Sequence, residues 1–148
     1  MESEDKTIAF VKKIAPQIST PEVIYAWIHQ DRSFLVLKRI EGSTSRDAWT
    51  SLSPSRRTAI ASTIAYYCNI LAQSTSQMLE SVSRQPVLEP YLALSGSDLL
   101  GSYTYEECAR YFSASSDGCP TLGQVFNFYH PDLGPGNVIV SDGRVAGI

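Results

Sequence analysis

The segment from Ser53 to Leu71 constrains the fold more than any other part of the sequence. Ser53 followed by Pro54 is typical of a helix N-cap with proline at the first helical position. Apolar residues then recur at helical spacing. The pattern predicts one long helix whose buried face is formed by Ile60, Ile64, Tyr67, Cys68 and Leu71.

Two further elements are expected before this helix. Residues 4–15 have the apolar spacing of a short amphipathic helix that ends near Pro16. The β-rich runs 23–28 and 34–40 are separated by a short polar segment, which predicts an antiparallel hairpin.

The second half of the chain predicts shorter elements. Residues 74–103 are rich in Ser, Pro and Gly, so we expect a long surface connection. Thr104 and Glu107 form a capping-box pattern ahead of a helix that contains residues 108–112 and is broken at 115–118. Apolar runs at 125–128, 138–140 and 145–148 predict strands, and Asp142-Gly143 between the last two is a hairpin signal. The expected class is α+β.

Composition narrows the function classes. The 148 residues suit one domain, and 43% hydrophobic and 18% charged residues are typical of an ordinary globular protein. A net charge of −3 gives no basic footprint, so we expect no nucleic-acid partner. No apolar run reaches membrane-span length, and the acidic N-terminal segment lacks a signal-peptide pattern. We expect a cytoplasmic protein with no membrane partner, and the oligomeric state is left open.

The three cysteines give no metal-binding or disulfide signature. Cys68, Cys108 and Cys119 are widely spaced and form no Cys-x-x-Cys pair. Without a secretion signal they are expected to be reduced. The simplest interpretation of each is a small apolar core residue.

Chemistry is concentrated in the segment His130-Pro131-Asp132-Leu133-Gly134-Pro135-Gly136-Asn137. A histidine, an aspartate two places on and an asparagine five further on have the spacing of a kinase catalytic loop. Asp132 would orient and deprotonate an acceptor hydroxyl, and Asn137 would offer Mg²⁺ a hard oxygen ligand. His130 is expected to brace the loop through hydrogen bonds. The alternative is an ordinary polar turn between two strands, where Asp, Gly, Pro and Asn are common.

The region around this loop resembles the aminoglycoside phosphotransferase family, in its fungal-type branch of the kinase-like superfamily. In that family an apolar strand is followed by the motif His-Gly-Asp-Leu-x-Pro-x-Asn, then by a second apolar strand and a turn. Residues 126–148 follow this order, with Pro131 in place of the common glycine. Residues 34–42 are similar to the family's hinge strand, and residues 49–53 with the next helix match the segment after it. Residues 4–11 and 20–23 resemble its glutamate-bearing helix and following strand. The likeness covers nearly the whole chain, but only the catalytic loop is specific.

The resemblance implies a partial protein-kinase-like fold within one domain, 1–148. Residues 1–42 would be an N-lobe remnant with the hinge, and 43–148 a partial C-lobe. Asp132, with His130 beside it, would be the catalytic base, and Asn137 would be a metal ligand.

The resemblance also implies nucleotide contacts. Lys38, Arg39 and Ile40 would meet adenine through backbone groups, and Glu4 would pair with a nucleotide-holding lysine. Glu4 could equally be an acidic residue at a frayed helix end, where the helix dipole stabilises it. The hinge run could instead be a core strand of a small sheet.

The implied activity is ATP-dependent phosphoryl transfer, with Mg²⁺, to a hydroxyl of a small molecule whose identity stays open. The glycine-rich phosphate loop, the nucleotide lysine and the second metal aspartate do not occur in this sequence. We therefore expect a form truncated at both ends that is incomplete or inactive. The alternative is a non-catalytic kinase-like binding protein or pseudokinase fragment.

Overall fold

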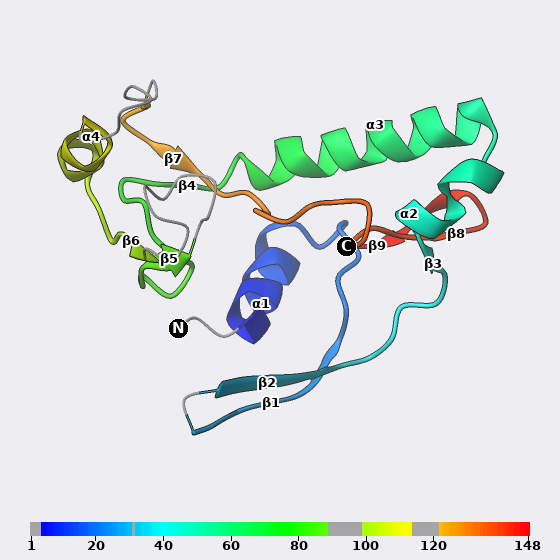
Figure 1. The fold of residues 1–148 in the computed structure, drawn as a ribbon, viewed down its shortest axis with the longest axis horizontal. Helices are drawn as coiled ribbons and strands as arrows, with labels where there is room; N and C mark the ends of the chain where they lie inside the picture. Colours follow the sequence, from blue (N-terminus) through cyan, green and yellow to red (C-terminus); the bar gives the residue numbers. More distant parts are fainter. Residues whose placement is uncertain (1–3, 31, 89–98, 114–121) are drawn as a thin grey trace.

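The computed structural model describes residues 4–30, 32–88, 99–113 and 122–148 as a mixed α+β protein with antiparallel sheets (Figure 1). None of its helices is long and apolar enough to cross a membrane. The elements follow in this order: α1 (Glu4–Ile14), β1 (Val23–His29), β2 (Arg32–Leu37), β3 (Ser43–Thr44), α2 (Ser45–Ala48), the 3₁₀ helix η1 (Trp49–Ser51), α3 (Pro54–Leu71), β4 (Thr75–Ser76), β5 (Val87–Leu88), β6 (Leu99–Leu100), α4 (Tyr105–Ser113), β7 (Phe126–Asn127), β8 (Ile139–Ser141) and β9 (Arg144–Gly147).

Helix α3 begins where the sequence predicts. The Ser53 hydroxyl accepts a hydrogen bond from the backbone N–H of Arg56 at 3.4 Å, and Pro54 is the first helical residue. Ile60 and Leu71 are buried, but Cys68 is exposed, so its predicted place on the buried face is wrong. At about 100° per residue, Cys68 lies at the edge of the stripe that these two residues define, and it faces solvent.

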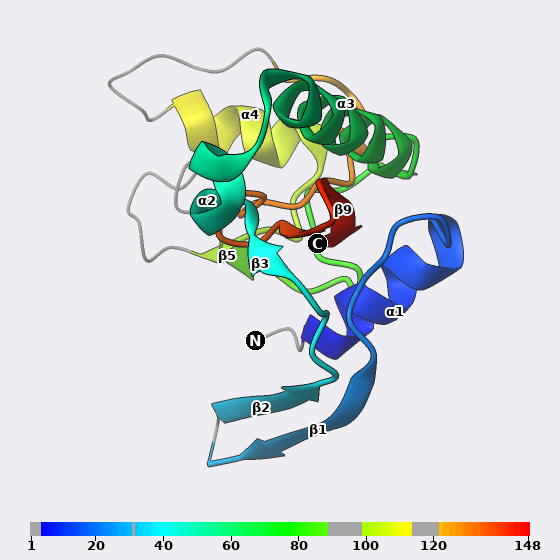
Figure 2. The same ribbon diagram turned by 90° about the vertical axis from the view of Figure 1, so that its right-hand side faces the viewer.

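Helix α3 takes part in two apolar clusters. The first contains Val11, Ala15 and Ile18 with Leu71, and the second contains Leu52, Ile60, Val138 and Val140. Ile148 packs against both. In Figures 1 and 2 the segment after β7 and strand β9 lie between α3 and α1, so the C-terminal residues fill the space between the two helices.

Strands β3, β8 and β9 form a three-stranded sheet with β8 in the centre. The predicted Asp142-Gly143 turn is confirmed, because both residues have positive φ, 51° and 74°, as a type I′ hairpin requires. Strand β3 and helix α2 are absent from the sequence prediction. Gly42 precedes them with a φ of 142°, and a Cβ there would collide with the carbonyl oxygen of Val140.

Strands β1 and β2 form the predicted hairpin, which extends from one side of the molecule with α1 as its nearest helix (Figures 1 and 2). Strand β2 ends at Leu37, so the predicted strand over residues 34–40 is too long. The backbone N–H of Lys38 still donates to Glu22 at 2.8 Å. Strand β1 begins only at Val23, so this bond is the last one that joins the two chains of the hairpin at its base.

The prediction of a surface connection over 74–103 is wrong in part. Strand β4 pairs with β7, β5 pairs with β6, and Leu100 is completely buried. These strands have two residues each and no periodicity of their own, so only partners distant in sequence define them. The capping box of α4 is confirmed: the Thr104 N–H donates to Glu107 Oε2 at 2.8 Å, and the Glu107 N–H donates to Thr104 Oγ1 at 3.3 Å.

Buried Cys108 is a core residue, as predicted. The predicted break at 115–118 and Cys119 lie outside the described residues.

Candidate active site

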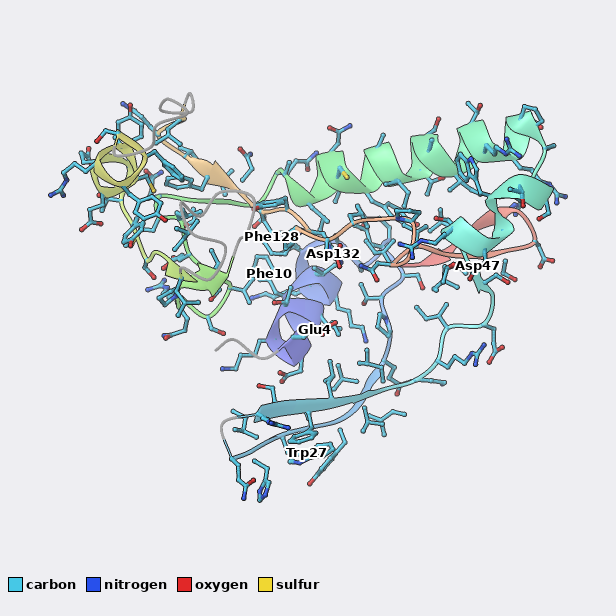
Figure 3. All side chains as sticks on the ribbon, in the orientation of Figure 1. Glu4, Phe10, Trp27, Asp47, Phe128 and Asp132 are labelled. Carbon is cyan, nitrogen blue, oxygen red and sulfur yellow. The ribbon has the colours of Figure 1, made fainter. Side chains whose placement is uncertain are left out.

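The loop between β7 and β8 is anchored in apolar clusters at both ends. At its start Phe128 packs against the first cluster, with its ring 5.2 Å from that of Phe10 in an edge-to-face contact, and its N–H donates to Ser74. At its end Val138 is buried in the second cluster, against which Leu133 also packs. Figure 3 shows Phe10, Phe128 and Asp132 in this region. The anchors hold the polar residues of the loop between them at the surface.

Asp132 and Asn137 are directly bonded to each other. The Asn137 amide nitrogen donates to the Asp132 backbone carbonyl at 2.7 Å and to Asp132 Oδ2 at 2.8 Å. Since both partners are acceptors, the amide orientation is fixed, with its nitrogen toward the aspartate and its oxygen Oδ1 turned away. The predicted proximity of these two side chains is therefore confirmed. Both residues are exposed.

His130 braces the same loop. The backbone N–H of Asp132 donates to His130 Nδ1 at 3.2 Å. In this contact Nδ1 is the acceptor, so the ring of His130 is oriented with Nδ1 toward the backbone of Asp132. His130 therefore fixes the backbone at Asp132, in agreement with the bracing role predicted for it.

The short helix α2 supports the second half of the loop. Ser45, which is buried, donates from Oγ to the Pro135 carbonyl at 2.9 Å and from its N–H to the Val138 carbonyl at 2.7 Å. The Arg46 N–H donates to the same Pro135 carbonyl at 3.0 Å. The sequence prediction misses this support. Residues 44–47 carry a local helix-cap signal, but nothing local shows that Ser45 contacts a residue 90 positions later.

The residues predicted for the hinge lie on the connection from β2 to β3. Lys38 is held by Glu22 through its backbone N–H and through an exposed ion pair of 3.2 Å. Arg39 and Ile40 follow, and in the described part of the chain their backbone groups take part in none of the backbone hydrogen bonds. The Ile40 side chain packs against the backbone of Gly147.

Glu4 lies in the first turn of α1 and is exposed (Figure 3). The ion pair found among the described residues joins Lys38 to Glu22 and does not involve Glu4. An acid in the first turn is stabilised by the helix dipole. The structure thus brings His130, Asp132 and Asn137 together and shows no hydrogen bond from Glu4 or from residues 38–40 to them within the described segments.

The donor set of the loop suits Mg²⁺. The Asn137 amide oxygen, which is turned away from Asp132, is a hard oxygen ligand, and Mg²⁺ usually takes one or two protein ligands while water and phosphate complete its shell. Among the described residues no group of three or more His, Cys, Asp or Glu could hold a metal by itself.

One depression in the surface has none of the residues His130, Asp132 and Asn137 in its lining. It is an open depression of about 570 Å³ where the C-terminal ends of α1 and α3 meet, lined by Ile14, Gln17, Tyr66, Ile70, Gln73 and Ser74.

Comparison with protein-family models, with curated proteins and with solved structures gave no match. The assignment of the candidate site is therefore based on the geometry of the loop between β7 and β8.

Proposed function

We propose that this chain carries the catalytic loop of an ATP-dependent phosphotransferase that acts on the hydroxyl of a small molecule. The supporting observation is the hydrogen-bonded pair of Asp132 and Asn137 on a loop anchored at both ends. The order of hinge, long helix, catalytic loop and β-hairpin also agrees with a protein-kinase-like fold of the aminoglycoside phosphotransferase type. An ordinary polar turn would not require this loop to be fixed by His130, Asn137 and Ser45 together.

Asp132 would act as the base. Its carboxylate is exposed, and one oxygen, Oδ2, accepts the bond from Asn137. The other oxygen is then left to accept a hydroxyl proton from an acceptor molecule, in the geometry that a general base needs. Because Asn137 holds Oδ2, the carboxylate keeps one orientation. It is therefore already positioned when the substrate binds.

The amide oxygen of Asn137, which is turned away from Asp132, would offer a ligand to Mg²⁺. When bound, the ion would neutralise charge on the phosphate groups of ATP. Arg39 and Ile40 would contact the adenine edge through backbone groups that have no backbone partner in the described part of the chain. Lys38 contributes less to this contact, because its own N–H already donates to Glu22.

A non-catalytic kinase-like protein is the second candidate. The observation that favours it is that Lys38, one of the residues assigned to the nucleotide, pairs its amine with Glu22. Such a protein would bind nucleotide or another partner through the same loop and hinge without transferring the phosphoryl group.

The test compares Asp132→Asn with Asp142→Asn, which makes the same chemical change at an exposed turn. Asparagine tolerates the positive φ of residue 142, and an asparagine side chain at position 132 can still accept the bond from Asn137. We measure Mg·ATP binding by calorimetry and ATP turnover with water as the acceptor. General-base loss predicts a fall in turnover of about 10²- to 10⁴-fold for Asp132→Asn, with binding retained and Asp142→Asn unchanged.

The other outcomes separate the candidates. Wild-type binding of Mg·ATP with background turnover in all three proteins supports the non-catalytic candidate. Equal turnover above background in wild type and Asp132→Asn would contradict the base role of Asp132. A lack of nucleotide binding would contradict the phosphotransferase.

A further inference from the structure

The side chain of Arg46 lies against the backbone of the candidate catalytic loop. Arg46 belongs to α2, which lies beside β8 (Figure 1), and its N–H donates to the Pro135 carbonyl at 3.0 Å. Its guanidinium reaches Gly136, because a Cβ at that glycine would come within 3.3 Å of Arg46 Nη2 and 3.7 Å of Cζ. The guanidinium is therefore placed next to the residue that precedes Asn137.

The glycine at position 136 keeps this contact open. A carbon at 3.3 Å from Nη2 would be closer than the usual separation of about 3.5–4.0 Å, so a side chain there would push the guanidinium away from the loop. Arg46 is exposed, and the described segments give its guanidinium neither a hydrogen-bond partner nor an ion-pair partner. Its N–H donors are therefore available to a ligand.

The neighbouring groups of the loop indicate what that ligand is. The Asn137 nitrogen is occupied by Asp132, and its amide oxygen is turned away as a ligand for Mg²⁺. A magnesium ion at that oxygen would carry phosphate oxygens as its other ligands. A guanidinium has a planar fork of donors that matches the oxygens of a phosphate group. Phosphate is thus the anion that both neighbouring groups recognise.

We propose that Arg46 binds a phosphate group at the catalytic loop. The inference rests on the proposed function, since a phosphotransferase brings phosphate to this place. Two sources share the chemistry: the phosphate chain of ATP and a phosphate carried by the acceptor molecule. From either source, the guanidinium holds the group beside Asn137 and neutralises part of its charge.

The test is an NMR titration with inorganic phosphate that follows the backbone amide of Gly136. One exposed guanidinium gives a weak site, so wild type should show a saturable shift with a Kd of about 1–10 mM. Arg46→Gln removes the charge and should weaken binding at least tenfold. Arg46→Lys keeps the charge without the planar fork and should give an intermediate affinity. The lysine variant also covers the case in which glutamine disturbs α2.

Arg56→Gln is the matched control. Arg56 is also exposed, and its side chain packs over Gly143 in the β8–β9 turn, so the variant makes the same change at another arginine that lies on a glycine. Its phosphate affinity should equal that of wild type. Equal affinities in wild type and Arg46→Gln would overturn the proposal, as would a Gly136 amide that does not respond to phosphate in wild type.

A second titration, in saturating Mg·ATP, distinguishes the two sources. If the phosphate chain of ATP occupies the Arg46 site, the apparent Kd for inorganic phosphate should rise at least tenfold. An unchanged Kd would assign the site to a phosphate on the acceptor. A protein that binds inorganic phosphate through Arg46 but does not bind Mg·ATP would contradict the proposed phosphotransferase and still support the phosphate site.

Discussion

Single residues decide where this chain can bend and which of its groups can react. Gly42 is the clearest backbone example: its φ of 142° and the nearby Val140 carbonyl leave no room for a side chain, so only glycine lets β3 lie against β8. Among side chains, Cys68 and Cys108 have the same chemistry but opposite environments. Cys68 is exposed on α3, and Cys108 is completely buried in α4.

This contrast predicts different thiol reactivities. Burial, with a smaller contribution from the negative charge of Glu107, raises the pKa of the Cys108 thiol above its ordinary value. Because the thiolate is the reactive form, iodoacetamide should alkylate Cys68 rapidly and Cys108 only slowly at pH 8. The measurement is mass spectrometry of the time course in a Cys119→Ser background. Equal rates at the two sites in the folded protein would contradict the described burial of α4.

The raised pKa of Cys108 also makes the free energy of unfolding depend on pH. The folded state favours the neutral thiol, so this contribution is fully present below the ordinary thiol pKa. It is lost as the pH rises through that value toward the raised pKa of the folded state. The free energy of unfolding should therefore fall with alkaline pH less steeply in Cys108→Ala than in the parent.

At the level of elements, local signals in the sequence identify helices α1, α3 and α4 and the two hairpins, whereas contacts between distant residues determine α2 and the short strands. Ser53-Pro54 and Thr104 with Glu107 predict the starts of α3 and α4, because a helix cap is a contact between residues three positions apart. The same locality explains why the spacing from Asp132 to Asn137 correctly predicts that the two side chains meet.

The errors arise where a partner lies far along the chain. Strand β3 and the buried Ser45 depend on β8 and on Pro135, which no local pattern indicates. The predicted strand extends to residue 40 because Ile40 is apolar and β-branched, whereas β2 ends at Leu37 and the Ile40 side chain packs against Gly147 of β9. The positions of Glu4 and the hinge relative to Asp132 are likewise set by packing and not by spacing.

The capping box of α4 gives a prediction at this scale. Thr104→Ala removes the hydroxyl that accepts the Glu107 N–H, and loss of such a cap typically costs about 1 kcal/mol of unfolding free energy. The matched control is Thr58→Ala in α3, where the hydroxyl bonds the Pro54 carbonyl one turn back and its loss should be neutral or slightly stabilising. Urea denaturation of both variants measures the difference. A Thr104→Ala protein as stable as Thr58→Ala would show that the box contributes nothing to α4.

At the scale of the whole molecule, helix α3 connects the parts on which the candidate site depends. Its C-terminal end packs in the first cluster, which anchors Phe128, and its N-terminal half packs in the second, which anchors Val138. The loop that carries Asp132 therefore spans two clusters that share one helix. Loss of packing in either cluster should release one end of the loop.

Leu71→Ala tests this coupling. Leu71 is 2% exposed in the first cluster, so truncation should cost about 2–5 kcal/mol through lost burial and a residual cavity. Leu99→Ala makes the same change at a residue that is 57% exposed and should cost far less. In a Trp27→Phe background, the single remaining tryptophan is Trp49, which precedes Leu52 of the second cluster.

If α3 couples the clusters, Leu71→Ala will shift the urea transition seen by Trp49 fluorescence and the transition seen by circular dichroism to the same lower midpoint. A Trp49 transition that stays at the parent midpoint would mean that the clusters unfold separately. In that case the first cluster could open while the second stays folded, and Phe128 could leave its anchor without disturbing Val138. The geometry of Asp132 would then depend on the hydrogen bonds of His130 and Asn137 more than on the core.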